Sequence, residues 1–321
     1  MRAALRYHYC SSDSLTISEL PIPQPKADEV LIRVKATTVN RTDVGILTGK
    51  PYAIRAFAGL FKPKIPVTGT DFAGIVEQVG AEVSRFRVGD RVWGFDDNGA
   101  GTHAEFVCFS EKKAILPIPE DWDFPEIVAC AEAANYAVNF LNKVTIEPEM
   151  KVLVNGGTGA IGSAAIQLLK AQQVEVTAVC FEKDLALVQA LGPDEVIALE
   201  KVDFTRENKT YDLVLDAVGK SRFSLCIPIL RPKGIYISSE LGPNWENIWL
   251  AMFSTFGKGQ KVIFPIPNHI LESMKQVTSL IEKGQFRPLI DDRRFTLSQI
   301  SEAFSYVASG KKIGNVILEI S

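Results

Sequence analysis

Residues 152–170 read VLVNGGTGAIGSAAIQLLK, where an apolar run stops at a glycine-rich loop and a helical pattern begins at once. Gly157, Gly159 and Gly162 have the spacing G-x-G-x-x-G. We expect Gly157 to allow the tight turn out of a strand, Gly159 to let backbone approach a pyrophosphate, and Gly162 to let the helix pack closely on the strand. Free N–H groups at the helix start would form an anion site. The stretch therefore predicts a bound dinucleotide.

The loop lies in a β-α-β context, which the motif requires. Helical segments alternate with strands expected at 174–179, 195–198, 211–216, 234–238 and 261–267. This alternation predicts an α/β fold with a doubly wound parallel sheet. An ordinary β-α-β turn without a ligand is the alternative interpretation of the glycines.

The first part of the chain is instead rich in strands and turns. Alternating segments predict strands at 30–36 and 74–79, while 88–94 and 103–107 each indicate a turn that leads into a strand. A helix is expected from Pro125 to about Asn142, before the glycine loop. A second helix, at about 268–283, precedes a short β-rich tail at 316–320. The length of 321 residues suits two domains.

Composition excludes several classes of protein. Hydrophobic residues make up 46% and charged residues 23% of the chain, and the net charge is −3, so no overall basic field favours nucleic acid. Residues 152–169 carry no charge, but their glycines and turn chemistry argue against a stable membrane insertion. The polar N-terminus and five scattered cysteines predict a cytoplasmic protein.

Several motifs in a fixed order give the chain a recognisable pattern. They are residues 39–43 (VNRTD), 66–74 (PVTGTDFAG), 86–92 (FRVGDRV), 101–106 (GTHAEF), the glycine loop, 211–219 (YDLVLDAVG) and 230–234 (LRPKG). With them the chain resembles the zinc-free quinone oxidoreductase branch of the medium-chain dehydrogenase/reductase superfamily.

This resemblance implies a GroES-like β-rich catalytic domain, residues 1–124 and 268–321, around a Rossmann cofactor domain, residues 125–267. It also implies an active site in the cleft between them and a homodimer joined through the strand at 261–267. An unpaired strand edge gives such a dimer an independent physical reason.

The resemblance also bears on metal binding. Metal-dependent members bind catalytic zinc with a cysteine, a histidine and a later Cys or Asp. Here Asn40 stands at the cysteine position, and Thr70 and Asp71 replace a His-Glu pair. An amide and a hydroxyl are poor zinc ligands. We predict no zinc, and keep an adventitious site of Cys130, Glu132 and Asp71 as the alternative.

The end of the second strand of the β-α-β unit selects the cofactor. An acid there would bind the ribose of NAD and repel the 2′-phosphate of NADP. The position is the neutral Cys180, and Lys183 follows, whereas Glu182 favours NAD. We therefore favour NADP(H) over NAD(H). The expected cofactor-binding residues are Gly157, Thr158, Gly159, Ala160, Ile161, Gly162, Cys180, Lys183, Ser238, Gly314 and Asn315.

Without zinc, no Lewis acid polarises a simple carbonyl, so the predicted substrate is a small apolar electrophile: a quinone or an α,β-unsaturated carbonyl. Asn40, Asp43 and Tyr52 are the catalytic candidates. Asn40 could donate to substrate or nicotinamide, Asp43 could hold its loop, and Tyr52 could supply a phenolic donor. A simple Asx turn at Asp43 and surface packing of Tyr52 are the alternatives.

Residues 50–65 allow three interpretations, and the chain as a whole allows two alternative functions. The segment combines Tyr52, Phe57, Leu60 and Phe61 with basic residues only, and predicts a lid, a surface helix touching membrane, or a helix packed on its domain. Its lysines could also serve the phosphopantetheine carrier of an enoyl-thioester reductase. A non-catalytic NADPH-binding sensor is the other alternative. A short-chain dehydrogenase is excluded, because no tyrosine has lysine four residues on.

Overall fold

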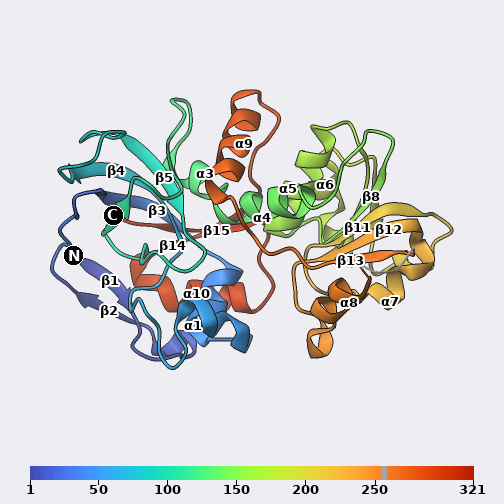
Figure 1. The fold of residues 1–321 in the computed structure, drawn as a ribbon, viewed down its shortest axis with the longest axis horizontal. Coiled ribbons are helices and arrows are strands. Elements are labelled where there is room, and N and C mark those ends of the chain that lie inside the picture. The colour runs from blue at the N-terminus through green and yellow to red at the C-terminus, as the bar shows by residue number, and fades with distance from the viewer. Residues whose placement is uncertain (255–258) are drawn as a thin grey trace. The chain divides into compact units, whose positions relative to one another are not determined.

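A computed structural model describes residues 1–254 and 259–321. The chain forms two compact units (Figure 1). Unit 1 contains residues 1–133, 270–282 and 290–321, so it holds both ends of the chain. Unit 2 contains residues 134–269 and 283–289.

Unit 2 is built on a six-stranded parallel sheet in the order β10-β9-β8-β11-β12-β13. The first strand of the unit is therefore central, and the connections reverse direction between β8 and β11, as in a doubly wound nucleotide-binding sheet. The expected α/β fold is confirmed. The strands are β8 (Lys151–Asn155), β9 (Glu175–Cys180), β10 (Glu195–Ala198), β11 (Tyr211–Asp216), β12 (Leu230–Ser238) and β13 (Lys261–Ile263).

Helices connect these strands. The uncharged stretch 152–169 divides into β8 and the helix α5, which explains its composition without a membrane span. Within the described part of the chain, every helix falls short of what crossing a membrane requires. The helices within unit 2 are α5 (Ala160–Lys170), α6 (Leu185–Gln189), α7 (Phe223–Cys226) and α8 (Glu246–Ser254).

Unit 1 is built on a seven-stranded, mostly antiparallel sheet in the order β14-β15-β3-β4-β5-β7, with β6 also paired to β3. The last strand joins the N-terminal part of the chain because Val316 pairs with Val39. A hairpin-like pair, β1 (Arg2–Leu5) and β2 (Thr16–Glu19), lies beside it. The sheet strands are β3 (Glu29–Val39), β4 (Asp71–Val79), β5 (Arg91–Phe95), β6 (Phe106–Ser110), β7 (Ile115–Pro117), β14 (Ile290–Thr296) and β15 (Asn315–Glu319).

One apolar core fills unit 1, with Phe72, Phe304 and Val316 among its buried side chains. The amphipathic patterns of its C-terminal helices explain their position against the sheet. Its helices are α1 (Arg41–Thr48), α2 (Arg55–Ala58), α3 (Phe124–Val128), α9 (Ile270–Glu282) and α10 (Ile300–Ala308), while α4 (Glu132–Leu141) begins in unit 1 and continues into unit 2.

Two expected elements differ from the structure. The strand expected at 261–267 ends at Ile263, because Pro265 and Pro267 lack the N–H that a ladder needs. The single helix expected at 125–142 is α3 and α4. Between them the N–H groups of Cys130 and Ala131 donate to carbonyls three residues back, so the α-helical pattern stops.

Candidate active site

The glycine loop connects β8 to α5. Its left-handed residue is Gly156, with φ of 92°, so the expected role of Gly157 in the turn was wrong. Gly157 instead keeps room for a neighbour, because a Cβ there would lie 3.0 Å from Cγ1 of Val188. Both N–H groups donate to the carbonyl of Val179 in β9, which ties the loop to the next strand.

The start of α5 fits a dinucleotide. Gly159 is its N-cap, without a side chain between the backbone and a bound group. A Cβ at Gly162 would lie 2.2 Å from the carbonyl oxygen of Gly156, so only glycine fits where helix and loop meet. Thr158 precedes the cap, and Ala160 and Ile161 supply N–H groups of the first helical turn, which have no partner within a helix. Loop, glycines and helix dipole together suit a pyrophosphate.

A row of polar side chains lies at the carboxyl ends of three adjacent strands. Asn155 of β8 is in register with Asp216 of β11, which is in register with Ser238 of β12. The amide of Asn155 donates to Asp216 across 3.0 Å, and the hydroxyl of Tyr236 donates to the same carboxylate across 3.1 Å. Ser238 was expected at this edge. Asn155 and Asp216 were not predicted as site residues from the sequence, although each is the polar residue that ends an apolar strand.

The end of β9 carries mixed charge. Cys180 is buried, and burial raises its pKa to about 11, so the thiol is neutral. Lys183 is exposed, with its Nζ 3.8 Å from Asp184. Glu182 is paired with Lys201 and not with the neighbouring Lys183. Lys201 is therefore a second cation at this place, which the sequence pattern did not single out.

In unit 1, Asn40 starts α1 as its N-cap. Its side-chain oxygen accepts from the N–H of Asp43 across 2.8 Å, and Asp43 accepts from the N–H of Asn40 in return. Its amide nitrogen donates to Oγ1 of Thr70 across 2.9 Å and lies 3.2 Å from Oγ1 of Thr38. Both ends of the amide are therefore used within the protein, which makes Asn40 a positioning residue.

Asp71 is fully buried under Asn40. It accepts from the N–H of Thr38 across 2.7 Å and from the hydroxyls of Thr37 and Thr38. Burial nevertheless raises its pKa to about 7, because these hydrogen bonds only partly offset the lost hydration and because Glu132 adds negative charge. Burial also raises the pKa of Asp43 well above its usual value, and the negative charge of Asp71 raises it further.

His103 completes this buried cluster. Its Nε2 lies 2.8 Å from the carbonyl oxygen of Thr38, which can only accept, so Nε2 carries the proton. Nδ1 then accepts from the hydroxyl of Thr68 across 2.8 Å. Both bonds suit the neutral ring, and burial lowers its pKa to about 4. The imidazole is therefore a neutral support 3.9 Å from Asp43.

A third buried carboxyl of this cluster, that of Glu132, lies at the start of α4. The hydroxyl of Thr42 donates to Oε1 of Glu132 across 2.8 Å. Glu132 is buried, and this burial raises its pKa, while Lys312 and Arg41 act in the opposite direction. The Nζ of Lys312 donates to the carbonyl of Gly314. Gly314 precedes β15, which begins at Asn315 and pairs with β3, so the tail motif reaches the end of β3 where Asn40 lies.

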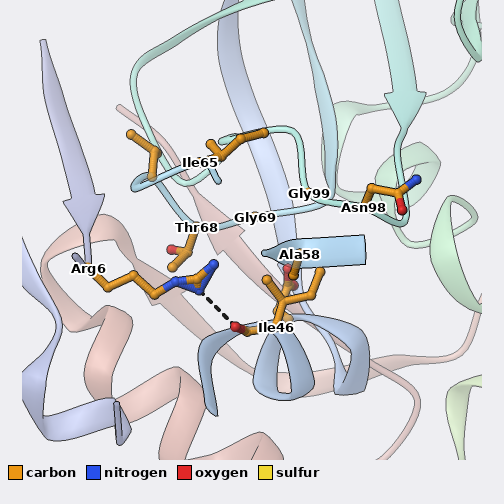
Figure 2. Close-up of a pocket in the computed structure, with 10 residues that line it drawn as sticks. Arg6, Ile46, Ala58, Ile65, Thr68, Gly69, Asn98 and Gly99 are labelled. Atoms are coloured by element: carbon orange, nitrogen blue, oxygen red, sulfur yellow. Dashed lines mark hydrogen bonds between the residues drawn. The ribbon is translucent and has the colours of Figure 1, made fainter. Parts of the chain in front are cut away.

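Tyr52 lies outside this cluster. Its side chain is exposed and its ring contacts the guanidinium of Arg55 at 4.9 Å, which favours the surface-packing alternative. A small pocket of unit 1 lies between this segment and α1 (Figure 2). Arg6 reaches into it and donates to the carbonyl of Ile46 across 3.0 Å. Arg6 and Asp43 are buried side chains on the wall of the pocket. We therefore interpret the pocket as part of the packing that holds α1 in place.

Comparison with known proteins agrees with this architecture. A family profile for the alcohol dehydrogenase GroES-like domain matches residues 26–120, and one for zinc-binding dehydrogenases matches residues 191–318. The chloroplast envelope quinone oxidoreductase homolog of Arabidopsis thaliana is 30% identical over 94% of this chain and 92% of its own length. The chain belongs to the quinone oxidoreductase branch of the medium-chain dehydrogenase/reductase superfamily.

Two further proteins are similar to this chain. The NADPH-dependent alkenal/one oxidoreductase of A. thaliana is 29% identical over 99% of this chain and 79% of its own length. The quinone oxidoreductase of Coxiella burnetii has the same fold, with a TM-score of 0.87 and 23% identity over 100% of this chain and 99% of that one. As a quinone oxidoreductase-like protein, the chain is an oxidoreductase with a GroES-like unit and a Rossmann unit.

The residues at the zinc position of this superfamily do not fit the metal. The amide of Asn40 is used at both ends, and Thr70 accepts one of its hydrogens. Among residues 1–254 and 259–321, no group of three or more His, Cys, Asp or Glu side chains is placed to hold a metal ion. We therefore derive no step of the reaction through zinc.

Proposed function

We propose that this quinone oxidoreductase-like protein is a zinc-independent, NADPH-dependent reductase that transfers hydride to a quinone or to the β-carbon of an α,β-unsaturated carbonyl. The Asn40 amide carries the proposal, because it fills the zinc position with a group already committed to Thr70 and Asp43. An acceptor that needs no Lewis acid fits such a site. The names of the quinone and alkenal/one relatives agree with this substrate class.

The protein supplies placement and a proton. A nicotinamide supplies the hydride when the cofactor is bound. The glycine loop and the first turn of α5 would hold the pyrophosphate, and the row from Asn155 to Ser238 supports the same edge of the sheet.

The proton is assigned to Thr42 and Glu132. Reduction adds one hydride and one proton, and the proton must reach the oxygen or α-carbon on which negative charge develops. Thr42 is partly exposed, two residues beyond Asn40, and its hydroxyl is 2.8 Å from Glu132. In the proposal, Thr42 gives a proton to the substrate as it takes one from the Glu132 carboxyl, with their hydrogen bond then running from Glu132 to Thr42. Burial raises the pKa of Glu132, which favours this role as an acid.

NADPH is proposed over NADH because Cys180 is neutral and because Lys183 and Lys201 lie at the end of β9. Substituting either Lys183 or Lys201 singly by Ala should raise the KM for NADPH by roughly fivefold and leave the KM for NADH unchanged, since one exposed cation on a phosphate is worth about 1 kcal/mol. Initial rates with both cofactors measure this. Equal changes for both cofactors would contradict the assignment.

The function itself is tested with purified protein, NADPH and a panel of quinones, enones and enoyl thioesters, followed at the nicotinamide absorbance. Oxidation with quinones or enones that a chelator leaves unchanged is the expected result. Preference for the thioesters would favour an enoyl-thioester reductase. Binding of NADPH without reduction of any acceptor would favour the sensor.

We further propose a homodimer through the edge strand β13. Within the described part of unit 2, exposed apolar side chains lie on α8, which packs beside this edge: Trp249, Met252 and Phe253. An open strand edge next to such a surface is a typical site of self-association. A cytoplasmic location remains a proposal as well, supported by five free cysteines, of which Cys130, Cys180 and Cys226 are buried.

A further inference from the structure

Residues 50–65, which we name the aromatic–basic segment, expose an unusual number of large apolar side chains. Single exposed apolar residues are ordinary, but a contiguous group marks an interaction surface. The fraction exposed is 65% for Tyr52, 63% for Phe57, 64% for Leu60, 88% for Phe61 and 39% for Ile65.

The backbone of this segment is held in place. The hydroxyl of Tyr9 donates to the carbonyl of Gly59, and the N–H of Lys64 donates to the carbonyl of Ala58 across 2.8 Å. Arg55 stacks on the ring of Tyr9 at 4.5 Å and donates to the carbonyl of Gly49. Ala58 is buried against unit 1. The exposed side chains are therefore presented by a fixed turn and not by a loose loop.

The charge of the segment is of one sign. It contains Lys50, Arg55, Lys62 and Lys64 and no Asp or Glu, in a chain whose net charge is −3. Asp96 belongs to the neighbouring loop that shares the pocket wall with Ile65, but its carboxylate is paired with Lys113 at 2.7 Å. The surface is locally cationic and apolar at once.

We propose that the aromatic–basic segment docks the protein on the surface of an anionic membrane. Lysines would contact the lipid phosphates and carboxylates, and Phe57, Leu60 and Phe61 would enter the boundary between headgroups and acyl chains. A second copy of the same surface is a poorer partner, because a two-fold contact would set the cations of one copy against those of the other. This inference does not depend on the proposed reduction.

Vesicle flotation tests the proposal with the full chain. Wild-type protein should float with vesicles of phosphatidylcholine mixed with phosphatidylserine and much less with phosphatidylcholine alone, and salt should release it. Leu60→Ser with Phe61→Ser, and separately Lys62→Glu with Lys64→Glu, should each weaken binding by roughly tenfold or more.

Matched controls exchange similar residues elsewhere on the surface. Val88→Ser with Leu225→Ser removes two exposed apolar side chains, and Lys275→Glu with Lys283→Glu reverses two exposed charges. Both control variants should float like the wild type. Equal loss of binding in controls and test variants would overturn the proposed location.

Protease protection of the wild-type chain tests the proposal even if the substituted variants fail to fold. Anionic vesicles should slow trypsin cleavage after Lys64, which precedes Ile65, and neutral vesicles should not. Absence of wild-type flotation with both kinds of vesicle would overturn the proposal. So would a change from dimer to monomer on substituting Leu60 and Phe61 without any vesicle binding, since the surface would then join two copies.

Discussion

At the scale of single residues, the buried polar cluster of unit 1 combines groups whose pKa values shift in opposite directions. Asp71 holds its proton up to about pH 7, whereas His103 stays neutral down to about pH 4. Both shifts have burial as their first cause, because burial disfavours whichever form is charged. A carboxyl and an imidazole are both neutral in the window between these values, so the cluster avoids a buried net charge there.

The two shifts predict opposite pH dependences of stability. Between about pH 4 and 7 the folded protein keeps a proton on Asp71 that the unfolded chain releases, so stability falls as pH rises. Between about pH 4 and 6.5 the unfolded chain protonates His103 and the folded protein does not, so stability rises with pH. Each group contributes a slope of about 1.4 kcal/mol per pH unit.

Asp71→Asn should therefore make the free energy of unfolding rise more steeply with pH across this window, and His103→Gln should make it fall. Urea unfolding at several pH values, each compared with wild type, measures the change of slope. Parallel curves of unfolding free energy against pH for the wild type and both variants would show that the pKa values of Asp71 and His103 are not shifted by folding.

Glu132 supports a prediction about activity. Glu132→Gln cannot resupply a proton to Thr42, so kcat should fall by about 100-fold. The loss of activity that we expect of the wild type as rising pH deprotonates Glu132 should be absent from this variant. Thr42→Val should have a similar effect on kcat, and Thr42→Ser should restore it. If Glu132→Gln kept the wild-type pH dependence of kcat, Glu132 would have only a structural role.

At the scale of elements, the loop between β8 and α5 shows how close packing selects glycine. Gly156 needs the left-handed backbone, while Gly162 needs the space that a Cβ would take from the carbonyl of Gly156. The motif was found from its spacing, but the assignment of the turn to Gly157 was wrong by one residue. Spacing cannot show φ, and two consecutive glycines satisfy the same pattern.

Gly162→Ala should cost about 1–3 kcal/mol in stability and abolish tight cofactor binding, because backbone must move to admit the methyl group. Gly157→Ala is the matched variant in the same loop, where the contact is a valine methyl group 3.0 Å away that can turn aside. It should lose less on both measures. Thermal unfolding and NADPH titration by fluorescence compare them, and equal losses would refute the packing argument.

At the scale of the whole molecule, the edge of the six-stranded sheet and the exposed face of α8 form a surface suited to self-association. Trp249→Glu with Phe253→Glu should convert the proposed dimer to a monomer, since two charges would have to enter an apolar contact. Light scattering measures the mass. A wild-type monomer at the same concentration would contradict the dimer, and reduction of acceptors by that monomer would separate assembly from activity.

The sequence alone determined the α/β fold, the position of the glycine loop and the family, because periodicity, strand–loop–helix order and motif spacing are local properties of a chain. It also brought forward Asn40, Asp43 and Asp71, although not their partners. Only the tertiary structure decided that the Asn40 amide is already used, that Thr42 meets Glu132, and that Tyr52 faces outward. Each of these depends on contacts between residues far apart in sequence, or on burial, and burial sets the pKa values that give the cluster its chemistry.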